Sequence, residues 1–174
     1  MSTEKSLLKL QNKLKGTLHT DALHKSLYAT DASVYRKTPL AVAIPKTEQD
    51  LIALIQFADE HDISLTPRTA GTSLAGQCVN EGIIVDTSKH FNQIKHIDTT
   101  QKTVTLHPGV IRDVLNTQLK EQGLFFGPNT STSNRCMIGG MVGNNSSGTT
   151  SIQYGVTRDK VLSLTALLSD GSKV

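Results

Sequence analysis

The sequence predicts an α+β fold with two subdomains, a small parallel βαβ unit and a second, mostly antiparallel sheet with helices. Three observations carry this prediction. Residues 41–66 have the pattern of a strand, a helix and a strand. Residues 91–107 have the pattern of a hairpin, and residues 128–159 are rich in glycine, asparagine and serine, which do not build a core.

The composition fits one folded domain or two small subdomains. The chain has 174 residues, of which 37% are hydrophobic, enough for a core. A scattered net charge of +3 and an aromatic content of 4% argue against a nucleic-acid surface. The N-terminus lacks an apolar signal region and no apolar run is long enough to span a membrane. We expect a location in the cytoplasm, either free or peripheral at the inner membrane face.

The first residues predict helices ahead of the main domain. Residues 2–15 place leucines on one helical face and end at Gly16. Residues 20–28 predict a second short helix with Thr20 as its cap, and residues 30–39 a polar connection. We therefore expect an N-terminal helical segment over residues 1–30, followed by the domain over residues 31–174.

The first subdomain is expected over residues 41–86. The apolar run 41–44 predicts a buried strand, and Thr47 followed by an acid three residues later resembles a capping box that opens a helix. Residues 63–66 predict a strand parallel to the first, because a helix joins the two. Residues 83–86 predict a third strand.

The second subdomain is expected over residues 91–174. Residues 91–98 and 102–107 alternate and predict an antiparallel hairpin. Residues 110–122 predict a helix, and residues 161–168 a strand before a turn. The apolar face of the helix is expected to consist of Val110, Val114, Leu115 and Leu119. The chain ends as the last hairpin starts, so we expect a fragment, truncated at its C-terminus.

A small-residue turn, residues 67–77, follows the second strand of the βαβ unit. Ligands bind outside the carboxyl ends of strands in such sheets, and consecutive amides in such a turn can bind an anion. Thr72 and Ser73 add hydroxyl donors, and Arg68 a positive charge. A Walker A loop is excluded because Gln77 stands where lysine is required. A nucleophile elbow around Ser73 is excluded because Ala75 stands where the motif has its last glycine. A Rossmann glycine motif is absent.

The stretch 128–159 predicts an ordered loop that cradles a ligand. It carries few charges and keeps an apolar residue every few positions, which disfavours disorder. Glycine is used where a ligand approaches the backbone closely. The five glycines of this stretch are Gly139, Gly140, Gly143, Gly148 and Gly155.

Metal and catalytic residues are not predicted. Cys78 and Cys136 lack metal-ligand spacing and fit reduced, structural thiols. The six histidines likewise form no metal pattern, and no residue has the surroundings of a proton-transferring base. These histidines are His19, His24, His61, His90, His96 and His107.

The two glycine-rich segments together resemble a known family. Residues 67–76 resemble the first FAD loop of FAD-linked oxidases with the vanillyl-alcohol-oxidase/p-cresol-methylhydroxylase-type (PCMH-type) FAD-binding domain. Residues 128–140 and 154–159 resemble the second FAD loop of that family. The resemblance covers residues 31–174 and is nearest to the D-lactate dehydrogenase and glycolate oxidase flavoprotein group.

The resemblance implies FAD as the cofactor, with the pyrophosphate held by backbone amides from Arg68 to Ser73 and both loops facing one cleft. Some members of the group are long chains with a C-terminal iron–sulfur portion, so a cluster outside this chain is implied as an option. The implied cofactor-binding residues are Pro67, Arg68, Thr69, Ala70, Gly71, Thr72, Ser73, Gly76, Gln77, Pro128, Asn129, Thr130, Ser133, Ile138, Gly139, Gly140, Gly143, Asn144, Asn145, Ser146 and Gly148.

The sequence departs from the family pattern at three places. Thr69 stands where the family usually has glycine, and Asn129-Thr130 replaces the more common Asp-Pro. Thr72 occupies the position of a flavin-linking histidine in some relatives, so the resemblance implies non-covalent FAD here.

The resemblance implies a flavin-dependent oxidoreductase acting on a D-2-hydroxy acid such as D-lactate or glycolate, with an electron acceptor as second partner. A flavoenzyme like UDP-N-acetylenolpyruvoylglucosamine reductase and a non-catalytic nucleotide-binding module are the alternatives. No nucleic-acid partner and no membrane span are expected. We expect no turnover by these 174 residues alone, because they offer no catalytic base.

Overall fold

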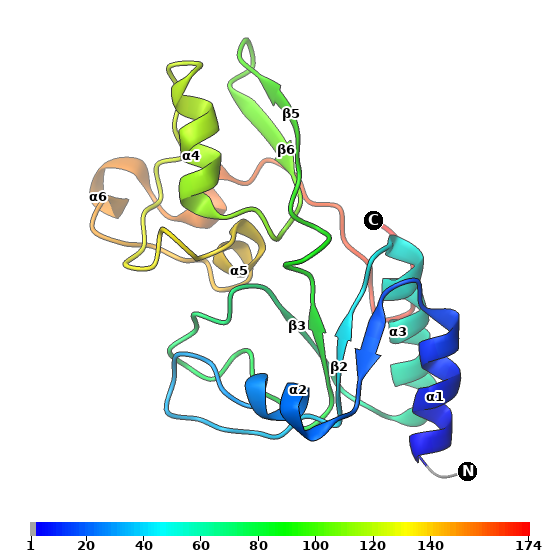
Figure 1. Ribbon diagram of the computed structural model, residues 1–174. Helices are drawn as coiled ribbons and strands as arrows, with labels where there is room; N and C mark the ends of the chain where they lie inside the picture. The colour runs from blue at the N-terminus through cyan, green and yellow to red at the C-terminus, as the bar shows by residue number, and fades with distance from the viewer. Residues whose placement is uncertain (1–2) are drawn as a thin grey trace. The chain divides into compact units, whose positions relative to one another are not determined.

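The computed structural model describes residues 3–174, which divide into two compact units. Unit 1 consists of the chain up to Arg68, Ser73–Asp86 and Leu164–Val174, and unit 2 of Thr69–Thr72 and Thr87–Ser163. The elements of unit 1 are α1 (Thr3–Lys13), β1 (Thr17–His19), α2 (Ala22–Leu27), β2 (Ala41–Ile44), α3 (Glu48–His61), β3 (Leu65–Arg68) and β4 (Ile83–Asp86) (Figure 1).

Unit 1 is built on a four-stranded sheet with the order β1-β2-β4-β3. Strand β4 pairs in parallel with both β2 and β3, whereas β1 pairs antiparallel with β2. The expected strands 41–44 and 83–86 are confirmed, and the strands flanking α3 run in the same direction, as predicted. They are not neighbours, however, because β4 lies between them. Strand β1 was missed by the sequence analysis and makes the sheet mixed.

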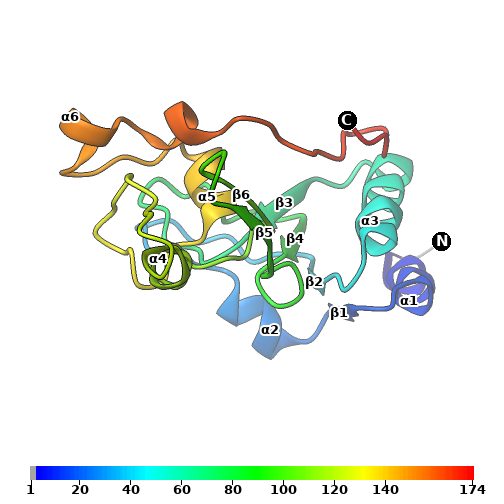
Figure 2. The ribbon, with the colours of Figure 1, turned by 90° about the horizontal axis from the view of Figure 1, so that it is seen from above.

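The core of unit 1 lies between the sheet and two helices. All residues of β2 and β4 are buried, which explains the apolar runs of residues 41–44 and 83–85. Helices α1 and α3 lie side by side against this core (Figures 1 and 2). The cluster consists of Leu7, Leu10, Ala41, Ala43, Leu54, Phe57, Ile83 and Val85.

Helix α3 begins with the predicted capping box. The Thr47 hydroxyl accepts from the Asp50 amide, and the Asp50 carboxylate accepts from the Thr47 amide. The same carboxylate accepts hydrogen bonds from the amides of Lys15, Gly16 and Lys46 at 2.8–3.0 Å. Asp50 therefore fixes the segment after α1 and the end of β2 as well as its own helix.

Unit 2 contains a hairpin, one longer helix and several short ones. Its elements are β5 (Ile94–Asp98), β6 (Thr103–Leu106), α4 (Arg112–Lys120), α5 (Ile138–Gly143), α6 (Ser151–Tyr154) and the 3-10 helix η1 (Thr157–Lys160). The predicted hairpin is confirmed by the antiparallel pairing of β5 with β6. Apolar side chains of this hairpin pack on a buried cluster made of Val110, Leu115, Leu119, Cys136, Ile138 and Met141.

Three local predictions were wrong. Asp21, not Thr20, is the N-cap of α2, and its carboxylate accepts from the His24 amide at 3.0 Å. Val114 is 48% exposed and does not belong to the apolar face of α4. Residues 161–168 form no strand, because a strand requires a neighbour and the described chain offers only a single bridge, Leu167 with Lys173.

None of the helices found in residues 3–174 combines the length and the hydropathy needed to cross a bilayer.

Candidate functional site

The first glycine-rich loop contains backbone amides that the protein itself does not use. Gly71 has φ +66°, a conformation that suits glycine and turns the chain sharply. Within residues 3–174, the amides of Ala70, Gly71 and Thr72 donate no hydrogen bond to the chain. All three residues are only partly exposed. Successive unpaired amides around a left-handed residue are the arrangement that binds phosphate groups.

The Arg68 side chain binds carbonyl groups of the protein itself. Its guanidinium donates from Nη1 to the carbonyls of Thr30 at 2.8 Å and of Tyr28 and Cys78 at 3.4 Å each. It also lies over the Tyr28 ring, 5.2 Å from the centroid. The guanidinium thus holds the base of the first loop to the segment after α2, and a contribution of its charge to ligand binding stays a prediction.

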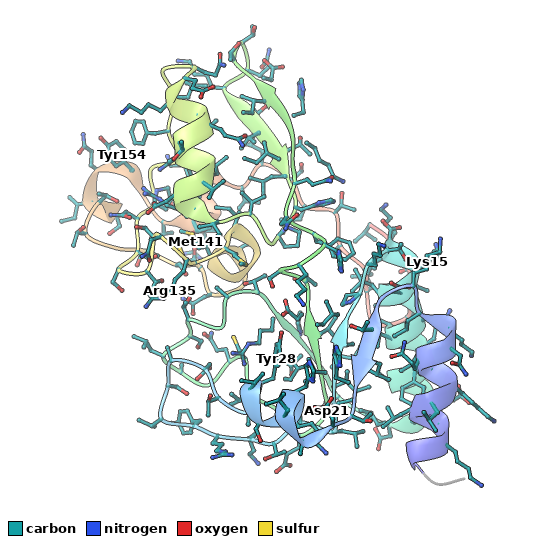
Figure 3. The ribbon with its side chains drawn as sticks, in the orientation of Figure 1. Lys15, Asp21, Tyr28, Arg135, Met141 and Tyr154 are labelled. Carbon is teal, nitrogen blue, oxygen red and sulfur yellow. The ribbon has the colours of Figure 1, made fainter. Side chains whose placement is uncertain are left out.

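Tyr28 and Asp86 extend this support. The Tyr28 hydroxyl donates to Oδ2 of the buried Asp86 at 2.5 Å. Burial, followed by the hydrogen bond to Asp86 and the charge of its carboxylate, raises the pKa of Tyr28 well above its usual value, against the opposing effect of Arg68. Tyr28 follows the last turn of α2, at the opposite end from Asp21 (Figure 3). The sequence analysis predicted no role for Tyr28 or Asp86. The position of Asp86, a charged residue at the end of an apolar strand, was a signal that could have identified it.

The second half of the first loop is held by its own side chains. The Ser73 hydroxyl donates to Oε1 of Gln77 and accepts from the amide of Ala75. Gly76 has φ +72°, and a Cβ there would lie 2.7 Å from the Tyr35 ring. Ser73, Gly76 and Gln77 thus have local structural reasons for their identity, independent of any ligand.

Helix α5 presents a face without side chains beside the first loop. A Cβ on Gly140 would lie 2.7 Å from Oγ1 of Thr69, so the two glycine-rich segments meet within unit 2. A Cβ on Gly143, one turn later, would have no described atom within 4 Å. Ile138 and Met141 point the other way, into the core. The bare face formed by Gly140 and Gly143 is open, partly bordered by Thr69.

Gly139 is explained by packing instead. A Cβ at this position would lie 2.4 Å from Cβ of Pro108. The amide of Gly139 donates to the Pro108 carbonyl at 2.8 Å. The close approach of α5 to the turn at Pro108 therefore requires glycine, and Pro108 was not recognised from the sequence because the two residues are distant in the chain.

The segment before α5 is tied into unit 2. Gly148 approaches the backbone of Asn129 so closely that no Cβ fits between them. The Ser133 hydroxyl donates to Asp113 at 3.0 Å, and Thr130 lies 3.2 Å from the Cys136 thiol. Pro128 is fully buried, while the buried Oδ1 of Asn129 has no hydrogen-bonding partner within residues 3–174. Of these predicted residues, Asn129 alone keeps an unused buried polar atom.

The segment after α5 is held in the same way. The Asn145 side chain accepts from the amide of Arg158 at 3.1 Å, and Asn145 adopts φ +46°. The Ser146 carbonyl accepts from the hydroxyl of Thr157 at 2.6 Å. The Asn144 amide side chain donates to the Ser146 hydroxyl at 3.0 Å. These hydrogen bonds fix the conformation of the segment that was predicted to cradle a ligand. The polar side chains named here are used for that purpose.

Two parts of unit 2 fit a bound dinucleotide such as FAD. The free amides of residues 70–72 suit its pyrophosphate, because anions bind where amides converge. The bare face of Gly140 and Gly143 admits the backbone approach of a flat, bulky group. By contrast, two surface hollows of unit 1, about 340 Å3 each, lie along α1 and contain none of the predicted cofactor residues.

The fold and these loops define a class, that of α+β proteins that bind a dinucleotide cofactor through glycine-rich backbone. The sequence matches the family described as FAD binding domain over residues 39–174. The chain belongs to this FAD binding domain family, and FAD is its cofactor.

Several curated proteins are similar in sequence. D-2-hydroxyglutarate dehydrogenase of Haemophilus influenzae is 41% identical over 160 residues, covering 90% of this chain and 16% of the relative. Glycolate oxidase subunit GlcD of Bacillus subtilis is 37% identical over 147 residues, covering 83% of this chain and 31% of the relative. The chain thus spans less than a third of the length of either relative.

Solved structures agree with the expected fold type. A structure of p-cresol methylhydroxylase with substrate bound superimposes with a TM-score of 0.83 at 17% identity, covering 98% of this chain and 34% of the other. At that identity the likeness concerns the fold alone. The prediction of a PCMH-type FAD-binding fold is confirmed.

Proposed function

We propose that this chain is the FAD-binding part of a flavin-dependent dehydrogenase that oxidises a D-2-hydroxy acid. The observation that carries the proposal is the meeting of Thr69 with Gly140, which brings unpaired amides beside a helix face without side chains. When bound, FAD supplies the acceptor for the two electrons and the proton that leave the substrate as a hydride.

The chain's own residues bind and orient the cofactor. The amides of Ala70, Gly71 and Thr72 hold the pyrophosphate, and Gly71 gives the turn its left-handed conformation. Gly140 and Gly143 leave room for the rest of the dinucleotide along α5. Thr72 offers a hydroxyl and no imidazole, so the cofactor is held without a covalent bond at this position.

The substrate class is proposed from the names of the relatives. The Haemophilus influenzae protein is named for D-2-hydroxyglutarate and the Bacillus subtilis protein for glycolate. Both are 2-hydroxy acids, and the higher identity belongs to the first. We therefore place D-2-hydroxyglutarate first among the substrates to test, ahead of glycolate and D-lactate. We propose no residue of this chain as the catalytic base, and the electron acceptor is to be identified by experiment.

Gly143→Val tests the proposed cofactor face. The added side chain enters space that is empty of protein atoms at a residue with ordinary helical backbone, so the fold is preserved. We expect FAD affinity, measured by flavin fluorescence titration, to fall by at least about tenfold, or 1.4 kcal/mol. Gly71→Val is less suitable, because its positive φ would strain any other residue.

The control is Gln118→Val, which adds the same side chain to the exposed face of α4. It should bind FAD as the unmodified chain does. Equal FAD affinity in a folded Gly143→Val variant would exclude this face from the site. Assaying the complete protein with D-2-hydroxyglutarate, D-lactate and glycolate and an artificial electron acceptor tests the activity, and turnover of none of the three would refute the substrate class.

A further inference from the structure

Three side chains that the cofactor site does not use converge where strand β1 meets helix α2. His19 ends β1, His24 is the third residue of α2, and Asp21, which Figure 3 labels, caps α2. Oδ2 of Asp21 lies 2.9 Å from Nδ1 of His24 and 3.9 Å from Nδ1 of His19. Across residues 3–174, this is the one group of three such side chains close enough to share a metal ion.

The distances suit a small divalent ion. Zinc holds imidazole nitrogens and carboxylate oxygens about 2.0–2.2 Å away, so neighbouring ligand atoms stand roughly 3–3.5 Å apart. The separations of 2.9 and 3.9 Å bracket that range, and one potential ligand atom from each residue lies within 4.8 Å of the others. Bringing all three atoms onto one ion requires the side chains to shift and the two imidazole rings to turn.

The two imidazole rings have room for this adjustment. They stack with centroids 3.6 Å apart and planes 7° from parallel. Coordination requires them to tilt out of that stack, so that a nitrogen of each faces the ion. The side chains of His19 and His24 are 26% and 32% exposed, and that of Asp21 is 52% exposed. The site is therefore open to solvent on one side, where water can complete the coordination.

The charge and ligand types select among metals. The Asp21 carboxylate is exposed and ionised at neutral pH, because an aspartate ordinarily has a pKa of about 4. One carboxylate with two imidazoles suits zinc, copper, nickel or cobalt, whereas calcium and magnesium prefer sites made of oxygen alone.

We propose that His19, Asp21 and His24 form a binding site for a divalent transition-metal ion of the zinc class. The spacing of the histidines in the sequence predicted no such site, and the fold supplies it by turning the chain between β1 and α2. A bound ion joins the edge strand of the sheet to the helix that follows it. All three residues belong to unit 1, whereas the proposed cofactor residues 70–72, Gly140 and Gly143 belong to unit 2.

The test is a zinc chloride titration of the purified, tag-free chain by calorimetry, with cobalt absorption as a second readout. We expect one ion to bind per chain and visible d–d bands from cobalt. Because the ion binds the folded state, saturating zinc should raise the melting temperature. Absence of saturable zinc binding up to about 100 μM, which corresponds to a free energy weaker than about −5.5 kcal/mol, would overturn the proposal.

Matched variants identify the ligands. Asp21→Asn retains an oxygen that can cap α2 while it removes the anionic ligand, so loss of affinity in this variant is not a loss of the helix. Asp21→Asn and His24→Ala should each weaken zinc binding by at least about tenfold. His96→Ala, at an exposed position of β5, should bind zinc normally. Equal zinc affinity in His24→Ala and His96→Ala would contradict the assignment.

Discussion

Tyr28 carries the clearest residue-scale consequence of the structure for stability. Its hydroxyl is bonded to the buried carboxylate of Asp86, and its ring lies beneath the Arg68 guanidinium. Burial and the contact with Asp86 favour the neutral phenol, and the nearby charge of Arg68 opposes them only in part. Tyr28, the last residue of the helix expected over residues 20–28, therefore helps to fix the base of the first loop through its contacts with Asp86 and Arg68.

The raised pKa of Tyr28 makes the stability of the protein depend on pH in the alkaline range. The pKa of Tyr28 is raised above its ordinary value of 10.0 in the folded protein. A raised pKa contributes stability that is fully present below the unfolded value and is lost as pH rises through the folded one. We expect the free energy of unfolding to fall as pH rises above about 10, and to fall less steeply in Tyr28→Phe. Urea titrations across this range measure both slopes.

Tyr35→Phe is the control for this experiment, because Tyr35 is 57% exposed. It should leave the alkaline slope unchanged. If Tyr28→Phe and the unmodified chain lose stability equally above pH 10, the Tyr28 hydroxyl is not protected by the fold.

At the scale of elements, Asp50 joins more of the chain than a helix cap does. Its buried carboxylate opposes desolvation with hydrogen bonds from the amides of Lys15, Lys46, Thr47 and Gly16, and these lower the pKa of Asp50. The Asp50 side chain therefore fixes three parts of the chain: the start of α3, the residues after β2, and the link from α1 to β1.

Asp50→Asn should lower the free energy of unfolding by about 2–4 kcal/mol at neutral pH, because several amides lose a charged acceptor. A lowered pKa contributes stability that is present above the unfolded value of 3.8 and is lost as pH falls. The difference between Asp50→Asn and the unmodified chain should accordingly shrink below about pH 4. Asp59→Asn, exposed on the same helix, is the control, and an equal effect of both variants would rule out the special role of Asp50.

Elements with a local signal were predicted well, and those defined by a partner were not. The apolar runs of β2 and β4 and the Thr47 capping box stand in a few consecutive residues, and each was found. Strand β1 is only Thr17–His19 and has no periodicity; it exists because β2 lies beside it. Residues 161–168 have a strand-like pattern, yet in the described chain they pair only through the single bridge of Leu167 with Lys173.

The same distinction applies to the candidate site. The two glycine-rich segments were recognisable from composition and spacing. The reasons for individual glycines could not be recognised, because Gly139 is required by the close approach of Pro108 and Gly76 by that of Tyr35. Both partners are far away in the sequence. The meeting of Thr69 with Gly140 likewise depends on the fold.

At the scale of the whole molecule, the chain has two hydrophobic cores. Leu54 is 1% exposed in the first and Leu115 is 1% exposed in the second. Truncating either leaves a cavity, so Leu54→Ala and Leu115→Ala should each lower the free energy of unfolding by about 2–5 kcal/mol. Hydrogen exchange should localise the effect, with faster exchange in β2 and β4 for Leu54→Ala and in α4 and β5 for Leu115→Ala.

Val114→Ala, on the exposed side of α4, is the control and should change stability by less than about 0.5 kcal/mol. Faster exchange of both cores to the same extent in either core variant would show that they open as one cooperative unit.

The return of the chain to unit 1 has a consequence for the order of assembly during synthesis. Lys173 Nζ lies 2.8 Å from Glu48 Oε2, although the residues are 125 positions apart. At about 5–20 residues per second, Lys173 leaves the ribosome roughly 6–25 s after Glu48. The buried cluster of unit 1 runs from Leu7 to Val85 and is complete by then. We therefore expect residues 164–174 to attach to a surface that has already folded, and the half-exposed ion pair of Lys173 with Glu48 to form last.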